Sequence, residues 1–413
     1  MSNRRIIAFN TISQVIGKVF TSGTTFILSM LLARTLGASG YGDFTKITTF
    51  VAFFYLFADF GLNTAYLELS DNDKTQNNLL ALRVIIGIFL MFLSVSILAF
   101  LPGTSVQGYT PMVKLGIILF SISILFQSLI TTANAFFQKN LRYELAAYAL
   151  VAGSFSSLLF VGVLISTHLM SVLSVILAFL SGSLVSALSS LFLSRKMGMK
   201  LIFSFDTSLV KKMLTIAFPL GLTLICNVVY FHADSVILAL FRSTEEVGIY
   251  GFAYKFFELP LVVPTFFMNA VYPLLLLSKK NEDMQAFIHQ VKQSALVLSV
   301  LSFILILFGY FVSPLIAFVK NDFQSSIEPF RILLLSLPVF YLTSVTMWVL
   351  IALKKRVQLL LIYLFSMIMN IGLNVFLIPI YGYMAAAWIT VVSETLVLFL
   401  SFLIIQRYFN SNS

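Results

Sequence analysis

The sequence predicts an all-α polytopic membrane protein with twelve spanning helices, and composition and run length both point to this class. Apolar residues make up 59% of the 413 residues and charged residues only 10%, whereas a soluble chain carries about 25% charged residues. The apolar runs at 84–101 and 295–319 each reach the roughly 20 residues that cross a bilayer. A β-barrel is disfavoured, because barrel strands alternate in polarity and are only about 10 residues long.

Polar residues, glycines and prolines divide the apolar sequence into twelve candidate spans joined by short loops. The spans lie at 8–35, 41–68, 79–101, 111–137, 144–167, 170–193, 210–241, 246–277, 287–315, 328–353, 357–380 and 384–407. The first follows Arg4 and Arg5 and is too long and too polar for a cleaved signal segment. The glycines of 37–42 form the turn before the second span, and the basic connector 194–212 is the longest link, between the sixth and seventh spans.

The distribution of lysine and arginine predicts the orientation of the spans. Eighteen of these residues fall on the side of the N-terminus and five on the opposite side, while Lys18, Lys46 and Lys255 lie within spans. The positive-inside rule therefore places both termini in the cytoplasm of a multi-pass cell-membrane protein. Topology also accounts for the net charge of +10, and no aromatic–basic platform indicates nucleic-acid binding.

A short repeat predicts two related halves. "GYGDFTK" (40–46) opens the second span and "IYGFAYK" (249–255) opens the eighth. Because the two spans are six apart, the copies run in the same direction, as in parallel-repeat transporters. We therefore expect two pseudo-symmetric six-helix lobes, 1–205 (helices 1–6) and 206–413 (helices 7–12), around a central cavity.

The three lysines within spans are candidate substrate ligands. An ammonium facing a low-dielectric cavity attracts an anionic group such as a phosphate. Alternatives remain open: Lys46 could pair with Asp43, and Lys255 could pair with Asp234 or Glu258. Lys46 and Lys255 could also snorkel to the interface. The polar residues that accompany these lysines as candidate substrate contacts are Asn10, Gln14 and Tyr254.

Carboxylates within spans are candidates for coupling transport to a proton or sodium gradient, because a buried carboxylate can exchange a cation as access alternates. The candidates are Asp234, Glu258 and Glu394. The alternative for each is a structural salt bridge, which is favoured for Asp59 near the end of its span.

Other chemistry is not indicated. The one cysteine, Cys226, lies in an apolar run, and the three histidines have no metal-ligand spacing. The sequence has no P-loop, dinucleotide-binding turn or nucleophile elbow. No cofactor or metal is therefore expected, and the short outer loops disfavour a membrane enzyme such as a polysaccharide polymerase.

Two stretches carry a resemblance to a known family. Residues 31–68 resemble the signature of the first two helices of O-antigen/teichoic-acid-type polysaccharide flippases, and 234–255 resemble its seventh-to-eighth-helix counterpart. Their superfamily also holds lipid II flippases and multidrug-and-toxin-extrusion antiporters. The resemblance implies alternating access and transfer of a polyprenyl-pyrophosphate-linked oligosaccharide from the cytoplasmic to the outer leaflet. It implies cationic cavity residues on the first, second and eighth helices, which here are Lys18, Lys46 and Lys255.

The expected function is therefore a flippase for cell-surface polysaccharide biosynthesis, with membrane lipids as surroundings and a polysaccharide polymerase or glycosyltransferase as candidate partner. The runner-up is a cation-coupled multidrug antiporter of the same superfamily. An antiporter for cationic drugs needs an acidic cavity, which Lys18 and Lys46 beside Asp43 and Asp59 do not provide.

Overall fold

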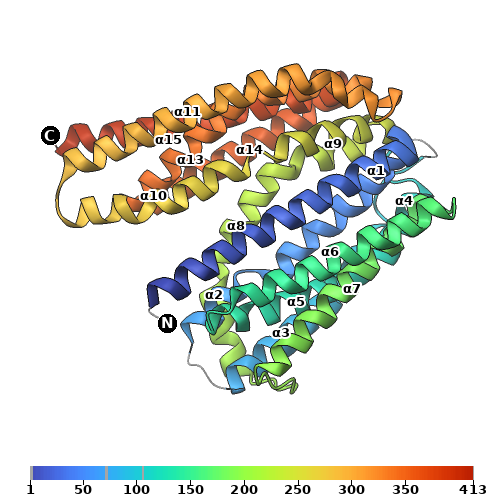
Figure 1. The fold of residues 1–413 in the computed structure, drawn as a ribbon, viewed down its shortest axis with the longest axis horizontal. Coiled ribbons are helices and arrows are strands. Elements are labelled where there is room, and N and C mark those ends of the chain that lie inside the picture. Colours follow the sequence, from blue (N-terminus) through green and yellow to red (C-terminus); the bar gives the residue numbers. More distant parts are fainter. Residues whose placement is uncertain (1–2, 70–72, 105–106, 413) are drawn as a thin grey trace. The chain divides into compact units, whose positions relative to one another are not determined.

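The computed structural model describes residues 3–69, 73–104 and 107–412, with side chains from residue 17 onward except at 220, 223, 227, 411 and 412. The described part is helical, with one isolated antiparallel bridge between Gly103 and Gly108. Figure 1 shows the helices as long rods within each half of the chain.

The helices are α1 (Asn3–Asp59), α2 (Leu62–Glu68), α3 (Asp73–Ile97), α4 (Pro111–Phe120), α5 (Ile122–Lys139), α6 (Tyr143–Ser166), α7 (Val172–Lys196), α8 (Thr207–Phe241), α9 (Thr244–Glu258), α10 (Val262–Lys280), α11 (Met284–Val312), the 3-10 helices η1 (Ser313–Phe318) and η2 (Asn321–Ser326), α12 (Ile327–Leu335), α13 (Leu337–Ala352), α14 (Arg356–Tyr381) and α15 (Tyr383–Asn412).

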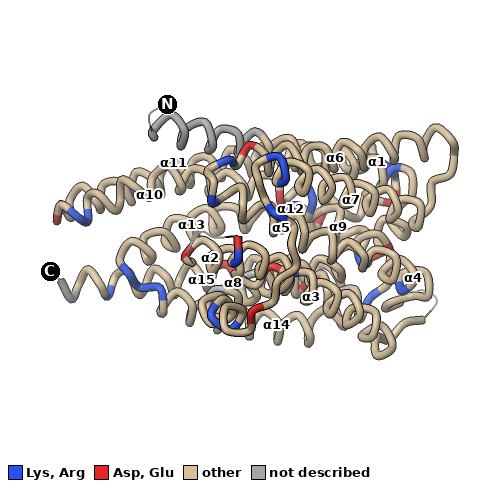
Figure 2. The backbone as a smooth tube through the Cα atoms, turned by 90° about the horizontal axis from the view of Figure 1, so that it is seen from below, with Lys and Arg blue, Asp and Glu red and all other residues tan. Residues whose placement is uncertain are grey.

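The predicted class of all-α polytopic membrane protein is confirmed. Among the described residues, eleven helical stretches are long and apolar enough to cross a membrane. One of them, Gly17–Glu68, has 52 residues, which at 1.5 Å per residue is about 78 Å, more than twice the roughly 30 Å hydrocarbon core. It contains the first two predicted spans, separated at Gly37, whose φ of 72° is readily adopted only by glycine. In Figure 2 the charged residues are scattered and long stretches of helix between them carry no charge.

The chain forms two compact units, residues 1–225 and 226–413. The division therefore falls within α8, whereas the lobes expected from the sequence meet at 205/206. The first half of α8 belongs to unit 1 because Val210, Met213 and Ala217 are buried in a cluster with Leu62 and Tyr66. The apolar pattern of a single helix could not reveal that its two halves belong to different cores.

Small residues hold α6 and α7 together in unit 1. A Cβ on Gly153 would lie 1.8 Å from Ser186 Oγ and 2.4 Å from the carbonyl oxygen of Gly182. A Cβ on Gly182 would lie 1.9 Å from Ser157 Oγ. The two helices can approach this closely only because both positions lack side chains, which is the packing mode typical of membrane helices.

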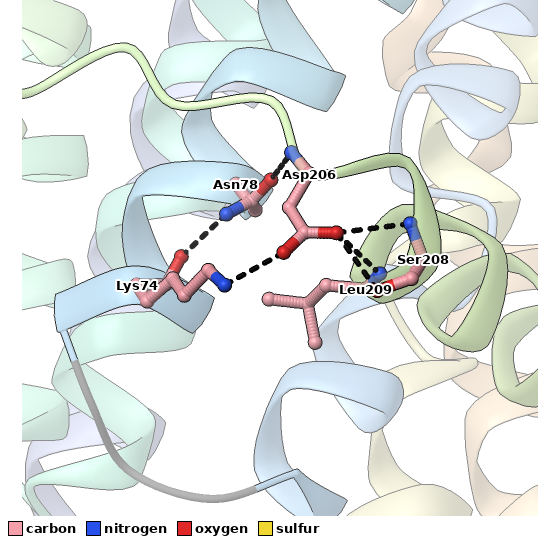
Figure 3. A network of polar contacts seen from close by, with 5 residues as sticks. All are labelled: Lys74, Asn78, Asp206, Ser208 and Leu209. Atoms are coloured by element: carbon pink, nitrogen blue, oxygen red, sulfur yellow. Dashed lines mark hydrogen bonds and ion pairs between the residues drawn. The ribbon is translucent and has the colours of Figure 1, made fainter.

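The mid-chain connector is shorter than expected, because α7 continues to Lys196 and α8 begins at Thr207. Asp206 starts α8: its Oδ1 accepts the backbone N–H groups of Ser208 at 3.0 Å and Leu209 at 3.3 Å, which satisfies donors left free at a helix start. Its Oδ2 lies 2.6 Å from Lys74 Nζ on α3, and Asn78 Oδ1 accepts its N–H (Figure 3).

A second ion pair fixes the same connector. Lys200 Nζ lies 2.6 Å from Asp73 Oδ2 at the start of α3. The hydrogen bond to Asp73 holds the pKa of Lys200 above its usual range. The pKa of Asp206 is held far below its usual range, mainly by the hydrogen bond to Lys74 and then by the bonds to Ser208 and Leu209. The connector therefore joins α3 to α8 through two oppositely oriented ion pairs.

Candidate functional site

Lys46 lies in the interior of unit 1. Its side chain is 1% exposed, and Nζ donates a hydrogen bond of 2.7 Å to the carbonyl oxygen of Gly108. Asp43, one helical turn earlier on α1, interacts with it electrostatically. Lys46 therefore joins α1 to the loop between α3 and α4. The alternative of pairing with Asp43 describes part of its electrostatic surroundings.

Lys255, the counterpart of Lys46 in the repeat, lies near the end of α9 in unit 2. Its Nζ is 2.7 Å from Glu258 Oε2, and both side chains are 36% exposed. Of the two carboxylates considered from the sequence, Glu258 and not Asp234 forms the ion pair. The repeat thus places one lysine in a buried position and the other in a half-exposed ion pair.

Lys18 lies on α1 and is exposed. The hydroxyl of Thr21 donates to the carbonyls of Gly17 and Lys18, and that of Thr25 to Thr21, so the threonines of this stripe are bonded to their own helix. Asn10 and Gln14 fall outside the described side chains.

Unit 2 contains a buried polar cluster around two of the predicted carboxylates. Asp234 on α8 is 4% exposed and accepts hydrogen bonds from the Tyr250 hydroxyl and the Ser235 N–H. Glu394 on α15 is 2% exposed, and Tyr230 Oη donates to its Oε2 at 2.9 Å. Asp234 and Glu394 are linked through Tyr230, which bonds Glu394 and lines the same cavity as Asp234. Glu258 forms its ion pair with Lys255.

A small cavity of about 10 Å³ opens at this cluster, enough for roughly one water-sized species. Tyr254, predicted as a substrate contact, is 8% exposed here and donates a long bond of 3.4 Å to the Phe231 carbonyl. The cavity is lined by Tyr230, Phe231, Asp234, Tyr254, Phe340, Asn370 and Thr390.

Two asparagines of the cluster were not predicted from the sequence. Asn370 Nδ2 donates to Ser393 Oγ at 2.9 Å, and Asn374 Nδ2 donates to Asn370 Oδ1 at 2.9 Å. They lie four residues apart in the largely apolar eleventh span. Two amides on one face of a spanning helix are the signal that would have marked them.

Asp59 has the structural role favoured by the sequence. Arg83 Nη2 lies 2.6 Å from Asp59 Oδ1 and 2.8 Å from Asn63 Oδ1. Arg83 is one of the eighteen basic residues that the charge distribution assigns to the side of the N-terminus, and its side chain, on α3, is fully buried. The pair bridges the break between α1 and α2, where Phe60 and Gly61 have positive φ angles of 38° and 73°.

The chain matches the family model described as polysaccharide biosynthesis protein over residues 7–279. Because this match spans most of the chain, the chain belongs to that family, and the resemblance expected from the sequence is confirmed. No curated protein sequence matches the chain.

Solved structures share the fold. The chain is similar to the lipid II flippase MurJ in an inward closed conformation, with 17% identity, 97% of this chain and 87% of that chain covered, and a TM-score of 0.79. An inward-facing multidrug resistance MATE family transporter of the MOP superfamily gives 12% identity, 95% coverage of both chains and a TM-score of 0.76. A MOP superfamily transporter from Pyrococcus furiosus, with a binding pocket described as reversed in polarity, gives 14% identity, 98% and 96% coverage and a TM-score of 0.61.

Proposed function

We propose that this protein is a flippase that moves polyprenyl-pyrophosphate-linked oligosaccharide from the cytoplasmic to the outer leaflet of the cell membrane, with both termini in the cytoplasm. The observation that carries the proposal is membership of the polysaccharide biosynthesis family in a chain with a flippase-like transporter fold. The substrate would come from a cytoplasmic glycosyltransferase and pass to a polymerase on the outer side.

The lysines are proposed to hold the pyrophosphate. Charged substrate groups lose hydration in a membrane interior, and facing cations offset that cost. Lys255 is the best placed, because it is half-exposed and its partner Glu258 can be exchanged for a phosphate oxygen. Lys46 would have to release the Gly108 carbonyl first, so its engagement requires a local rearrangement. Lys18, which is exposed, supplies the third charge.

The remaining predicted contacts are proposed to serve the sugar and the coupling ion. Asn10, Gln14 and Tyr254 would hydrogen-bond sugar hydroxyls. Asp234 and Glu394 would exchange a proton or sodium ion. This is supported by the burial of both and by the small cavity, which Asp234 lines and which Glu394 borders through its partner Tyr230. Glu258, the third candidate for ion coupling, is paired with Lys255. This supports a role as the counter-ion of that phosphate-binding lysine rather than in coupling.

The test of the lysines is export of lipid-linked oligosaccharide in flippase-deficient cells, at matched membrane levels. Wild type should restore export. Lys18→Ala and Lys255→Ala should lower it by about tenfold or more, since a charge-assisted bond of 1.5–3 kcal/mol corresponds to that factor. Lys292→Ala, in the first half of α11, removes a charge of no proposed function and serves as the control. Full export by all three lysine variants, Lys46→Ala included, would remove the pyrophosphate assignment.

The alternative is a cation-coupled multidrug antiporter, which the MATE-like fold allows. Within unit 1 the carboxylates Asp43 and Asp59 do not favour it, because Asp59 is paired with Arg83 and Asp43 interacts with Lys46. Drug accumulation in cells with and without the chain separates the two functions: an antiporter lowers accumulation, and the proposed flippase leaves it unchanged.

A further inference from the structure

One face of α8 forms an open groove that the proposed function does not use. The groove has a volume of about 510 Å³ and lies entirely within unit 1. Its residues recur every three or four positions, so they share one helical face. They are Phe205, Thr207, Val210, Lys211, Leu214, Thr215, Phe218 and Pro219.

The groove has a fixed floor and exposed walls. Val210 at its floor is 6% exposed and packs into the unit 1 core. Phe205, Leu214 and Phe218 are 51%, 37% and 59% exposed. The start of α8 is held against α3 by the ion pair of Asp206 with Lys74, and the Phe218 ring packs edge-on against Phe60, with 6.0 Å between the ring centroids. Contacts within unit 1 therefore fix the shape of this apolar face of α8.

The groove has a charged residue near one end and apolar residues beyond it, as a phospholipid has a charged headgroup and an apolar acyl chain. Lys211 lies near the polar end, beside the connector, and Leu214, Phe218 and Pro219 follow along the helix. From Lys211 to Pro219 the helix rises about 12 Å, at 1.5 Å per residue, close to the roughly 15 Å of one leaflet of the hydrocarbon core. A headgroup at Lys211 would thus leave its acyl chain along the apolar part.

The charge at the polar end is available. The neighbouring Lys74 and Lys200 are neutralised by Asp206 and Asp73, whereas no ion pair involves Lys211 among the residues that the structure describes. Lys212, Arg195 and Lys196 add exposed positive charge nearby in the sequence. Clusters of four to eight basic residues beside a spanning helix are typical of anionic-lipid sites.

We infer that the α8 groove binds an anionic phospholipid, with the headgroup phosphate on Lys211 Nζ and one acyl chain along Val210, Leu214 and Phe218. The occupant is a bulk lipid of the surrounding leaflet. None of the lysines proposed to hold the transported substrate lines this groove.

The test uses the purified full-length chain in phosphatidylcholine nanodiscs containing phosphatidylglycerol with a photoreactive acyl chain. Peptide mapping should find saturable labelling within residues 205–219. Lys211→Gln should lower that labelling about fivefold, the effect of one basic residue near an anionic surface. Lys211→Arg should retain it, and Lys212→Gln, which removes the adjacent exposed charge outside the groove, should lower it less than Lys211→Gln does.

The apolar part has its own test. Leu214→Trp fills the groove and should lower labelling of 205–219, whereas Leu188→Trp at an exposed position of α7 should not. Equal labelling by a photoreactive phosphatidylcholine, or unchanged labelling in Lys211→Gln, contradicts the inference. Displacement of phosphatidylglycerol by equimolar polyprenyl pyrophosphate also overturns it, because the groove would then belong to the transported lipid.

Discussion

Arg83 shows how a buried charge is maintained inside unit 1. Its Nη2 contacts Asp59 and Asn63, while Nε and Nη1 have no hydrogen-bond partner among the described residues. Asp59 is 31% exposed and Arg83 is fully buried. The buried Arg83 therefore needs its counter-charge more than the partly exposed Asp59 does.

This asymmetry predicts the order of two stability effects. Asp59→Ala leaves a buried guanidinium without its counter-charge and should lower the free energy of unfolding by about 3–5 kcal/mol. Arg83→Met leaves only a partly exposed carboxylate and should cost less. Thermal unfolding in detergent measures both, and the double variant should be more stable than Asp59→Ala alone. An equal loss in the two single variants would contradict this reading.

At the scale of helices, the contact between α6 and α7 depends on two positions without side chains. Gly153→Leu should lower the free energy of unfolding by about 1–3 kcal/mol, the usual cost of overpacking, because Ser186 and the Gly182 backbone occupy the space. Gly162→Ala on the same helix is the matched control. A Cβ there meets nothing within 4 Å, and alanine favours the helix. Thermal unfolding should separate the two variants clearly, and equal stability would show that the helices separate at no cost.

The connector between α7 and α8 should respond to acid. Since Lys74 lowers the pKa of Asp206, the contribution of Asp206 to stability is complete above the unfolded carboxyl pKa of about 3.9. It is lost as the pH falls from there toward the folded pKa. Proteolysis of residues 197–206 should therefore accelerate below about pH 4 in wild type. Asp206→Asn should be cleaved faster at neutral pH and should lose most of this pH dependence. A wild-type profile that is flat through this range would contradict the role of the pair.

Much of the fold is predictable from single stretches of sequence, because span length and loop charge are local properties. The partners of polar residues are not local. Tyr230 and Glu394 are 164 residues apart, and Lys46 is bonded to a loop carbonyl that no side-chain pattern reveals. The sequence therefore identified Asp234, Glu394 and Tyr254 as candidates, but not Asn370 and Asn374 or the hydrogen bonds that join the cluster.

At the scale of the whole molecule, the two units contribute different kinds of polar group. Unit 1 contains Lys18 and Lys46, while unit 2 contains Lys255 and the buried Asp234 and Glu394 cluster. Under the proposed function, the lysines of both units would attract the anionic substrate, and the carboxylates of unit 2 would respond to a cation. Coupling then predicts that Asp234→Asn makes transport insensitive to an imposed proton or sodium gradient. Glu258→Gln, as the control, should keep that sensitivity.

The most direct measurement of the central claim is transbilayer movement of a polyprenyl-pyrophosphate-linked oligosaccharide in liposomes containing only the purified chain. A membrane-impermeant glycosidase added outside reports how much substrate reaches the outer leaflet. The account predicts that the inner-leaflet share becomes accessible at a rate proportional to the amount of protein, and that Lys255→Ala slows it. Accessibility equal to that of protein-free liposomes, across several oligosaccharides and with proton and sodium gradients imposed, would contradict it.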